Sequence, residues 1–270
     1  MGGRCPPRRD VRSRTALARP PAVRLLVAAV DWSGRLTGAD RRIWTAVASC
    51  DGLFALEGGR NRDQLGDHLI GLALAEPELV VGLDFGFSLP QWFLDQAGLE
   101  NGMAVPEALA ESWLGNCPSP FWGRRGCCRG PQPQHRLTEQ QLAFPAKSVF
   151  QIGGAGAVGT GSLRGFPLLR RLRAEGFAIW PFDHPRPATV VEIYPRLLTR
   201  RVIKSRPEQR WRYLNERGWP LEGVVSEDAF DAEVSALVMA GHAAELAALP
   251  AEVDARMRRE GRIWQPATRG

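Results

Sequence analysis

The sequence lacks the cysteine patterns of thiolate metal sites and of disulfide-rich proteins. It has five cysteines and four histidines among 270 residues, and Cys117, Cys127 and Cys128 follow no CxxC spacing. An odd, unpatterned set of cysteines in a chain of this length argues against a disulfide framework and favours the reducing cytoplasm. For the same reason, zinc held by these cysteines and His135 is disfavoured.

Long apolar runs are also missing. No stretch is long enough to cross a membrane, and the run from Leu25 to Val30 is too short for the core of a secretory signal. We therefore expect no membrane partner. With 44% hydrophobic residues, the chain can bury one substantial core, and we expect a single folded domain over residues 23–270.

Positive charge is concentrated at the N-terminus. Residues 1–24 hold seven arginines against Asp10, which accounts for the whole formal net charge of +6. This segment is rich in proline and has no apolar helical face, so residues 1–22 are predicted to be a disordered basic tail. The rest of the chain is neutral overall, and its net charge alone does not predict nucleic-acid binding.

The order of apolar segments predicts a mixed sheet. Strands are expected at residues 23–31 and 42–50, with a hairpin turn at Asp51 and Gly52 leading to a third strand. A helix then separates this meander from a strand at residues 79–83. Because a helical crossover returns a strand in parallel, the fourth strand is expected beside the first. The prediction is an α/β fold with a mixed five-stranded sheet flanked by helices.

The second half contains an irregular insertion. Residues 100–146 are dense in glycine, proline and arginine, which is typical of a loop. Its Phe121 and Trp122, with nearby arginines, form a combination that single-strand binders use, although a solvated loop is the preferred interpretation. Beyond it, we expect a helix over residues 166–175, a strand at 177–182, an acid-bearing strand at 189–194 and two further helices.

Several apolar segments each carry a carboxylate. Asp31, Asp84 and Glu192 lie in or at the end of predicted buried strands, and Asp228 and Asp231 lie three residues apart at the start of the last long helix. Burying such charges is costly unless a cation or hydrogen-bond donors compensate. Hard oxygen ligands from several elements suit Mg²⁺ or Mn²⁺, and two such ions can promote phosphodiester hydrolysis. All five acids are therefore predicted metal ligands and catalytic residues.

Purely structural roles for the acids stay open at this point. Buried ion pairs with arginines would also stabilise strand carboxylates, and acids at a helix start are ordinary capping residues. A phosphate-bearing substrate needs cations beside an acidic site, for which Lys204, Arg164 and Lys147 are the candidates. No histidine lies near the acids in sequence except His184, but a water polarised by a metal needs none.

The order of five segments resembles the domain-of-unknown-function family 429, from about residue 24 to the C-terminus. The segments are VDWSG, VGLDFGFSLP, FQIGGAGAVGTGSLRGFPLLRRL, VVEIYPRLL followed by Lys204, and SEDAFDAEVSALVMA.

That resemblance implies a ribonuclease H-like fold and nuclease activity on nucleic acid. Asp31 would be the first-strand acid, Asp84 the fourth-strand acid, and Asp228 and Asp231 the final-helix pair, which is also similar to that of Holliday-junction resolvases of the RuvC type. Glu192 belongs to the family's own motif. The choice between DNA and RNA and the oligomeric state stay open.

Nucleotide binding is the rival interpretation. Gly154, Gly156 and Gly159 match GxGxxG, and Asp183 follows at the distance of a ribose contact. The expected helix, however, begins only near Phe166, too late to direct its dipole at a pyrophosphate.

The acid-glycine pattern around the first and fourth strands also occurs in sugar kinases and actin-like ATPases, which usually contain two copies of the fold. A non-catalytic binding protein with the same fold is a further alternative.

Overall fold

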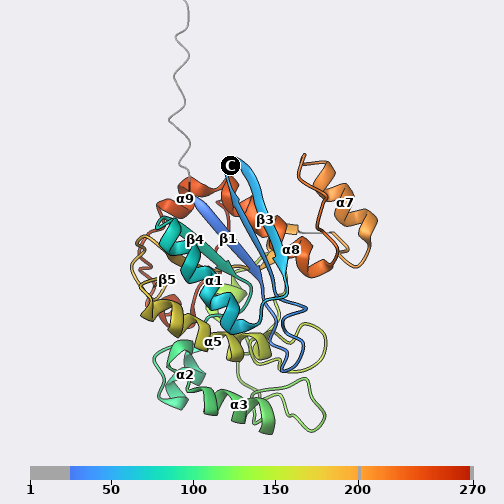
Figure 1. Ribbon diagram of the computed structural model, residues 1–270. Helices are drawn as coiled ribbons and strands as arrows, with labels where there is room; N and C mark the ends of the chain where they lie inside the picture. The colour runs from blue at the N-terminus through green and yellow to red at the C-terminus, as the bar shows by residue number, and fades with distance from the viewer. Residues whose placement is uncertain (1–24, 200–201, 268–270) are drawn as a thin grey trace, which may run out of the picture.

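The computed structural model describes residues 25–199 and 202–267, and the predicted basic tail lies outside these ranges. Its centre is a six-stranded sheet in the order β3-β2-β1-β4-β6-β5 (Figure 1). The strands are β1 (Leu26–Asp31), β2 (Trp44–Ser49), β3 (Gly52–Gly58), β4 (Leu79–Leu83), β5 (Ala178–Ile179) and β6 (Thr189–Glu192).

The sheet is mixed, as predicted. Strands β1, β2 and β3 form an antiparallel meander, whereas β4 lies parallel to β1 and pairs on its other side with β6. The predicted count of five strands is wrong, because β5, which lies within the strand expected at 177–182, also joins the sheet and pairs in parallel with the outer side of β6.

Helices cover both faces of the sheet. Helix α8 (Glu227–Gly241) packs on β1, β2 and β3, while α1 (Arg62–Ala75) and α5 (Val158–Ala174) cover the opposite face (Figure 1). Side chains along β1 alternate between these two cores: Val27 and Ala29 pack with α8 residues, and Ala28 and Val30 pack on the other side. Asp31 continues this alternation on the α8 face.

The shorter helices surround this framework. They are α2 (Gln91–Ala97), the 3₁₀ helix η1 (Gly102–Ala104), α3 (Glu107–Asn116), α4 (Leu137–Gln140), α6 (Pro195–Thr199), α7 (Pro207–Asn215), α9 (Ala243–Ala247) and α10 (Met257–Glu260). Within the described ranges, no helix is both long and apolar enough to cross a membrane.

The segment predicted as an irregular insertion, residues 100–146, is partly helical, and its apolar side chains join the core that α1 and α5 cover. Phe93, Trp113 and Phe121 contact one another edge-on or tilted, with ring centroids 5.2 to 5.6 Å apart. Phe121 is fully buried, so it cannot stack on a base.

The cysteines of this segment also depart from the sequence prediction, because the structure joins Cys117 to Cys127 in a disulfide. Cys128 stays free and exposed.

Helix α5 begins eight residues before the position predicted from sequence. Glycines give this segment a low intrinsic helix propensity, which is why the pattern predicted a start near Phe166. Tertiary packing accounts for the earlier start: the Trp32 indole N–H donates to the Gly161 carbonyl at 2.9 Å, and Gly165 leaves room for the Phe85 ring. The glycines therefore let α5 approach the segments that follow β1 and β4.

Replacement of Gly165 by alanine should destabilise the protein by about 1–3 kcal/mol, because the new Cβ would lie 2.4 Å from the Phe85 ring. The matched control is Gly71→Ala in α1, where a Cβ meets nothing within 4 Å. That control should stabilise by about 0.5–1 kcal/mol through helix propensity. Chemical denaturation of both variants measures the difference; equal effects would contradict the close approach.

Candidate functional site

The carboxyl ends of two neighbouring parallel strands bring Asp31 and Asp84 together. Asp31 is the last residue of β1, and Asp84 directly follows β4, where its backbone N–H donates to the Val30 carbonyl at 3.1 Å. Both residues are partly exposed. The pairing of β1 with β4 therefore fixes their proximity, as the sequence predicted.

Helix α8 adds acids from the same face of the sheet. Ser226 caps the helix by accepting the Ala229 N–H at 3.0 Å, which places Asp228 and Asp231 in its first turns. The negative charges of Asp84, Asp231 and Asp228 all act on Asp31. Four of the five predicted acids thus share one region.

These carboxylates strongly perturb one another's protonation. Burial, followed by the charges of Asp84 and Asp231, holds the pKa of Asp31 well above its usual range. Burial and the Asp231 charge raise the pKa of Asp84 to about 8, and burial raises the pKa of Asp231 to about 6. Without a further cation, the group therefore resists full ionisation at neutral pH.

Lys204 supplies a counter-charge. Its ammonium group forms an ion pair with the Asp231 carboxylate. Burial alone would lower the pKa of Lys204, but Asp231 together with Asp84 and Asp31 raises it overall. The lysine thus lies at the acids as expected, and in this structure it binds a protein carboxylate. Asp228 has a separate partner in Arg42, at 3.1 Å, which no sequence pattern indicated.

Glu192 does not join this group. It lies on the sheet face opposite Asp31, with Val190 in the core beneath α5. Arg136 binds both carboxylate oxygens, at 2.5 and 2.8 Å, and the Phe87 N–H donates to the same carboxylate at 2.9 Å. The Glu192 carboxylate is thus held by Arg136 from the other side of the sheet, although its charge still acts on Asp84 and, in addition to burial, raises the pKa of that carboxyl. Its charge is compensated by an arginine, the alternative that the sequence left open.

Arg164 lies in α5, and Lys147 lies shortly before the glycine-rich segment that leads into this helix. Arg164 forms an ion pair with Glu111 at 2.8 Å and donates to the Gly34 carbonyl at 2.7 Å. Lys147 is exposed, and its side chain runs beside Gly156. No contact joins either residue to the aspartates among the parts of the chain that the structure describes.

The donor chemistry of the aspartates suits Mg²⁺ or Mn²⁺. Within residues 25–199 and 202–267, no hydrogen bond reaches the carboxylates of Asp31 or Asp84, and the buried Asp231 Oδ1 has no hydrogen-bond partner either. Hard cations prefer such oxygens. The same residues, however, include no group of three or more acidic, histidine or cysteine side chains already arranged as a metal shell. The acids fit a hard cation by chemistry, but no coordination geometry is formed.

A further buried acid on α8 escaped the sequence analysis. Glu233 is fully buried, and neither of its carboxylate oxygens has a hydrogen-bond partner among the described residues. Burial raises the pKa of Glu233 to about 7. The apolar neighbours of Glu233 in sequence gave no sign that this helix is buried on nearly every side.

The GxGxxG segment differs from the sequence prediction in one respect. Helix α5 does begin at these glycines, contrary to the late start used against a dinucleotide site. Residues 148–152, however, contribute only an isolated bridge and no strand of the sheet. Asp183, the proposed ribose contact, instead pairs with Arg173 in the last turn of α5 and accepts the Ile179 N–H. The strand-turn-helix unit of a dinucleotide site is therefore not formed here.

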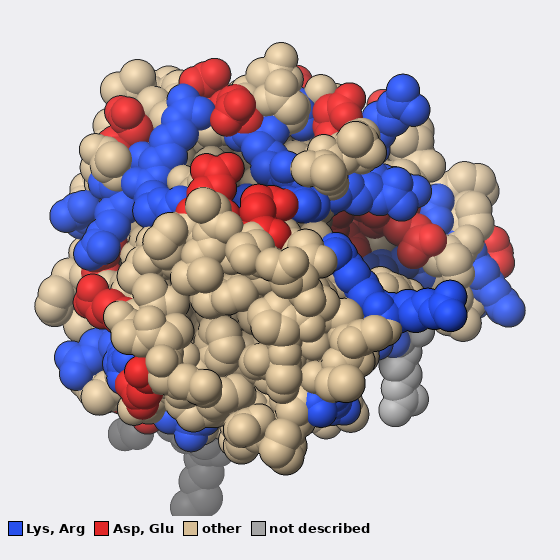
Figure 2. Space-filling model, turned by 90° about the horizontal axis from the view of Figure 1, so that it is seen from below, with Lys and Arg blue, Asp and Glu red and all other residues tan. Residues whose placement is uncertain are grey.

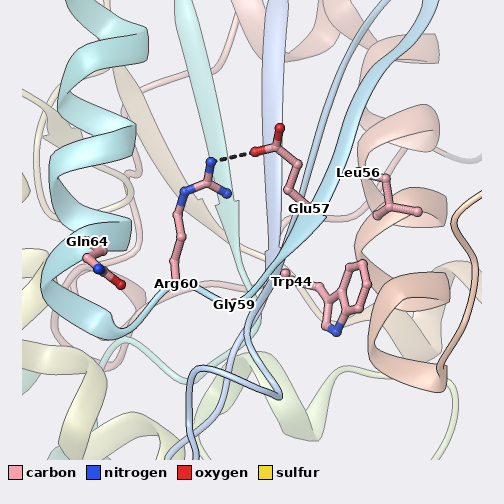
Figure 3. Close-up of a pocket in the computed structure, with 7 residues that line it drawn as sticks. Trp44, Leu56, Glu57, Gly59, Arg60 and Gln64 are labelled. Atoms are coloured by element: carbon pink, nitrogen blue, oxygen red, sulfur yellow. Dashed lines mark hydrogen bonds and ion pairs between the residues drawn. The ribbon is translucent and has the colours of Figure 1, made fainter.

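A separate hollow of about 640 Å³ straddles the edge strand β3. Figure 3 shows Trp44 and Leu56 toward α8 and Arg60 and Gln64 toward α1, with an ion pair between Arg60 and Glu57. None of the five predicted acids lines it. The hollow is thus distinct from the aspartates.

No family model, curated protein or solved structure was found to match the chain. The resemblance to family 429 stays a prediction from its motifs.

The two kinds of acid should respond oppositely to neutralisation. Glu192→Gln should destabilise the protein by about 1–3 kcal/mol, because the amide loses a charge-assisted hydrogen bond with the buried Arg136, which keeps its ion pair with Glu139. Asp31→Asn should raise the thermal midpoint of the metal-free protein at neutral pH, because folding then no longer has to protonate a carboxylate that burial, followed by repulsion from Asp84 and Asp231, disfavours. Thermal and chemical unfolding in EDTA test both; a destabilised Asp31→Asn would refute the repulsion.

Proposed function

We propose that the protein is a metal-dependent nuclease with a ribonuclease H-like fold. The observation that carries the proposal is the convergence of Asp31, Asp84 and Asp231 at one sheet edge, with poorly compensated carboxylate oxygens. The strand order, with an antiparallel meander followed by a parallel fourth strand beside the first, agrees with the fold that the family resemblance implies. Buried, mutually perturbed acids of this kind gather at functional sites.

Asp31, Asp84 and Asp231 would hold Mg²⁺ or Mn²⁺, with Asp228 at the rim. When bound, such ions supply a nucleophilic water and neutralise charge on the phosphodiester. The protein's own residues keep the acids in place and limit water around them. Lys204 offsets part of their negative charge, which lowers the barrier to the approach of a phosphate-bearing strand.

Glu192 has a positioning role in this proposal. Its carboxylate accepts the Phe87 N–H, three residues after Asp84, and is itself fixed by Arg136. This contact ties the segment after β4 to β6. The segment that carries Asp84 is therefore held from the face opposite the metal ligands.

The nuclease assignment predicts cleavage within a panel of single-stranded, duplex, branched and RNA–DNA hybrid substrates in the presence of Mg²⁺ or Mn²⁺. Asp31→Asn should lower the rate at least about 100-fold, because it removes a ligand charge, while the fold is retained. Asp67→Asn, at an exposed ion pair on α1, is the matched control and should cleave like the wild type.

Two outcomes would reject the assignment. One is a folded wild-type protein that cleaves no substrate with either ion. The other is an Asp31→Asn variant as active as the control.

A further inference from the structure

A second pocket, which the segment just after Asp31 helps to line, carries positive charge. It has a volume of about 600 Å³, and Arg35, Arg124 and Arg164 line it together with a single acid, Glu111. Gly34 and Thr160 also line it, so the pocket begins three residues after Asp31. Figure 2 shows the molecule from the side on which α3 lies: lysine and arginine side chains form a band across this face, with fewer acidic ones between them.

Two arginines, of which Arg164 lines the pocket, hold the backbone of the segment that follows Asp31. Arg164 donates to the Gly34 carbonyl at 2.7 Å, and Arg62 donates to the Ser33 and Arg35 carbonyls. Burial, and next the charge of Arg164, lower the pKa of Arg62. Guanidinium groups are thus crowded around one short segment.

The pocket keeps donors free for a ligand. Arg35 is exposed, and among the described residues its guanidinium has no hydrogen bond or ion pair. Among the described residues, Arg124 donates hydrogen bonds to the Leu114 and Ile152 carbonyls and forms no ion pair. The charge of Glu111, which pairs with Arg164, also acts on it. Three guanidinium groups against one carboxylate leave the pocket positive, which favours an anion.

Helix α5 itself contributes little. Near its start, the N–H groups of Val158 and Gly159 are already bonded to the carbonyls of Gly156 and Gln151. Recognition would therefore rest on the arginine side chains. Planar guanidinium groups bind phosphate oxygens through paired hydrogen bonds.

We propose that this pocket binds a backbone phosphate of the nucleic-acid strand whose neighbouring phosphodiester reaches the aspartates. The inference rests on the proposed nuclease function, because only a strand carries further phosphates beside the one at Asp31. The substrate class is then a single strand, or a strand end, held by its backbone without reading of its bases.

Binding without cleavage tests the pocket separately from catalysis. A labelled single-stranded oligonucleotide of about 12 nucleotides is titrated in EDTA with fluorescence anisotropy at several salt concentrations. Arg35→Glu should weaken binding about tenfold and reduce the slope of log K against log salt by about 0.7, the value for one single-strand phosphate contact. The matched control, Arg258→Glu, changes an exposed arginine on α10 outside the pocket and should match the wild type.

A second variant covers the pocket wall. Arg124→Ala should weaken binding in the same direction, with its thermal midpoint measured to exclude a folding defect, since Arg124 also bonds to two backbone carbonyls. Unchanged binding by Arg35→Glu, or equal loss in the Arg258→Glu control, would overturn the inference. An affinity for inorganic phosphate as high as that for the oligonucleotide at equal ionic strength would also overturn it, because the pocket would then select a free phosphate and not a strand.

The two proposals fail in different ways. If Arg35→Glu loses strand binding and the wild type cleaves no substrate, the pocket proposal is supported and the nuclease proposal is rejected. If Asp31→Asn abolishes cleavage but Arg35→Glu binds the strand as tightly as the wild type, the nuclease proposal is supported and the pocket proposal is rejected.

Discussion

The parallel pairing of β1 with β4 is the constraint on which the site depends. It aligns the ends of the two strands, so Asp31 and Asp84 leave the sheet at the same edge. Because side chains alternate with a period of two, a shift of one residue in β1 would turn Asp31 away from α8. The apolar residues Val27 and Ala29, buried against α8, resist such a shift. Core packing therefore specifies the position of a charged group that the core itself disfavours.

Much of this framework was readable from the sequence because local signals agreed with the fold. Residues 79–83 form the predicted strand, and Asn61 starts α1 with its side chain bonded to the Gln64 N–H. The predicted start of α5 was wrong, because the glycines in its first turns and Pro167 disfavour a helix locally. Its start is determined by contacts with Trp32 and Phe85, which lie far away in the sequence.

Only part of the site could be predicted from the sequence, for a related reason. Alternation along β6 places Glu192 and Val191 on opposite faces, but the sequence does not relate the faces of β6 to those of β1 across the sheet. The partner of Glu192, Arg136, is 56 residues away in a segment without regular pattern. Likewise, no sequence pattern indicated that Arg42 is the partner of Asp228. Acids in apolar runs can be found from sequence, whereas the charges that compensate them depend on tertiary structure.

The segment from Asp31 to Arg35 joins two regions of opposite charge. At one end, aspartates repel each other and would repel a phosphate; at the other, Arg62 and Arg164 hold the backbone carbonyls while Arg35 stays free. Attraction at the basic end can offset repulsion at the acidic end, because Gly34 of the pocket is three residues from Asp31. Three residues span at most about 10 Å, which is comparable to the Debye length, so screening over that distance is incomplete. A strand that spans both regions would therefore be favoured over a single phosphate, which can occupy only one.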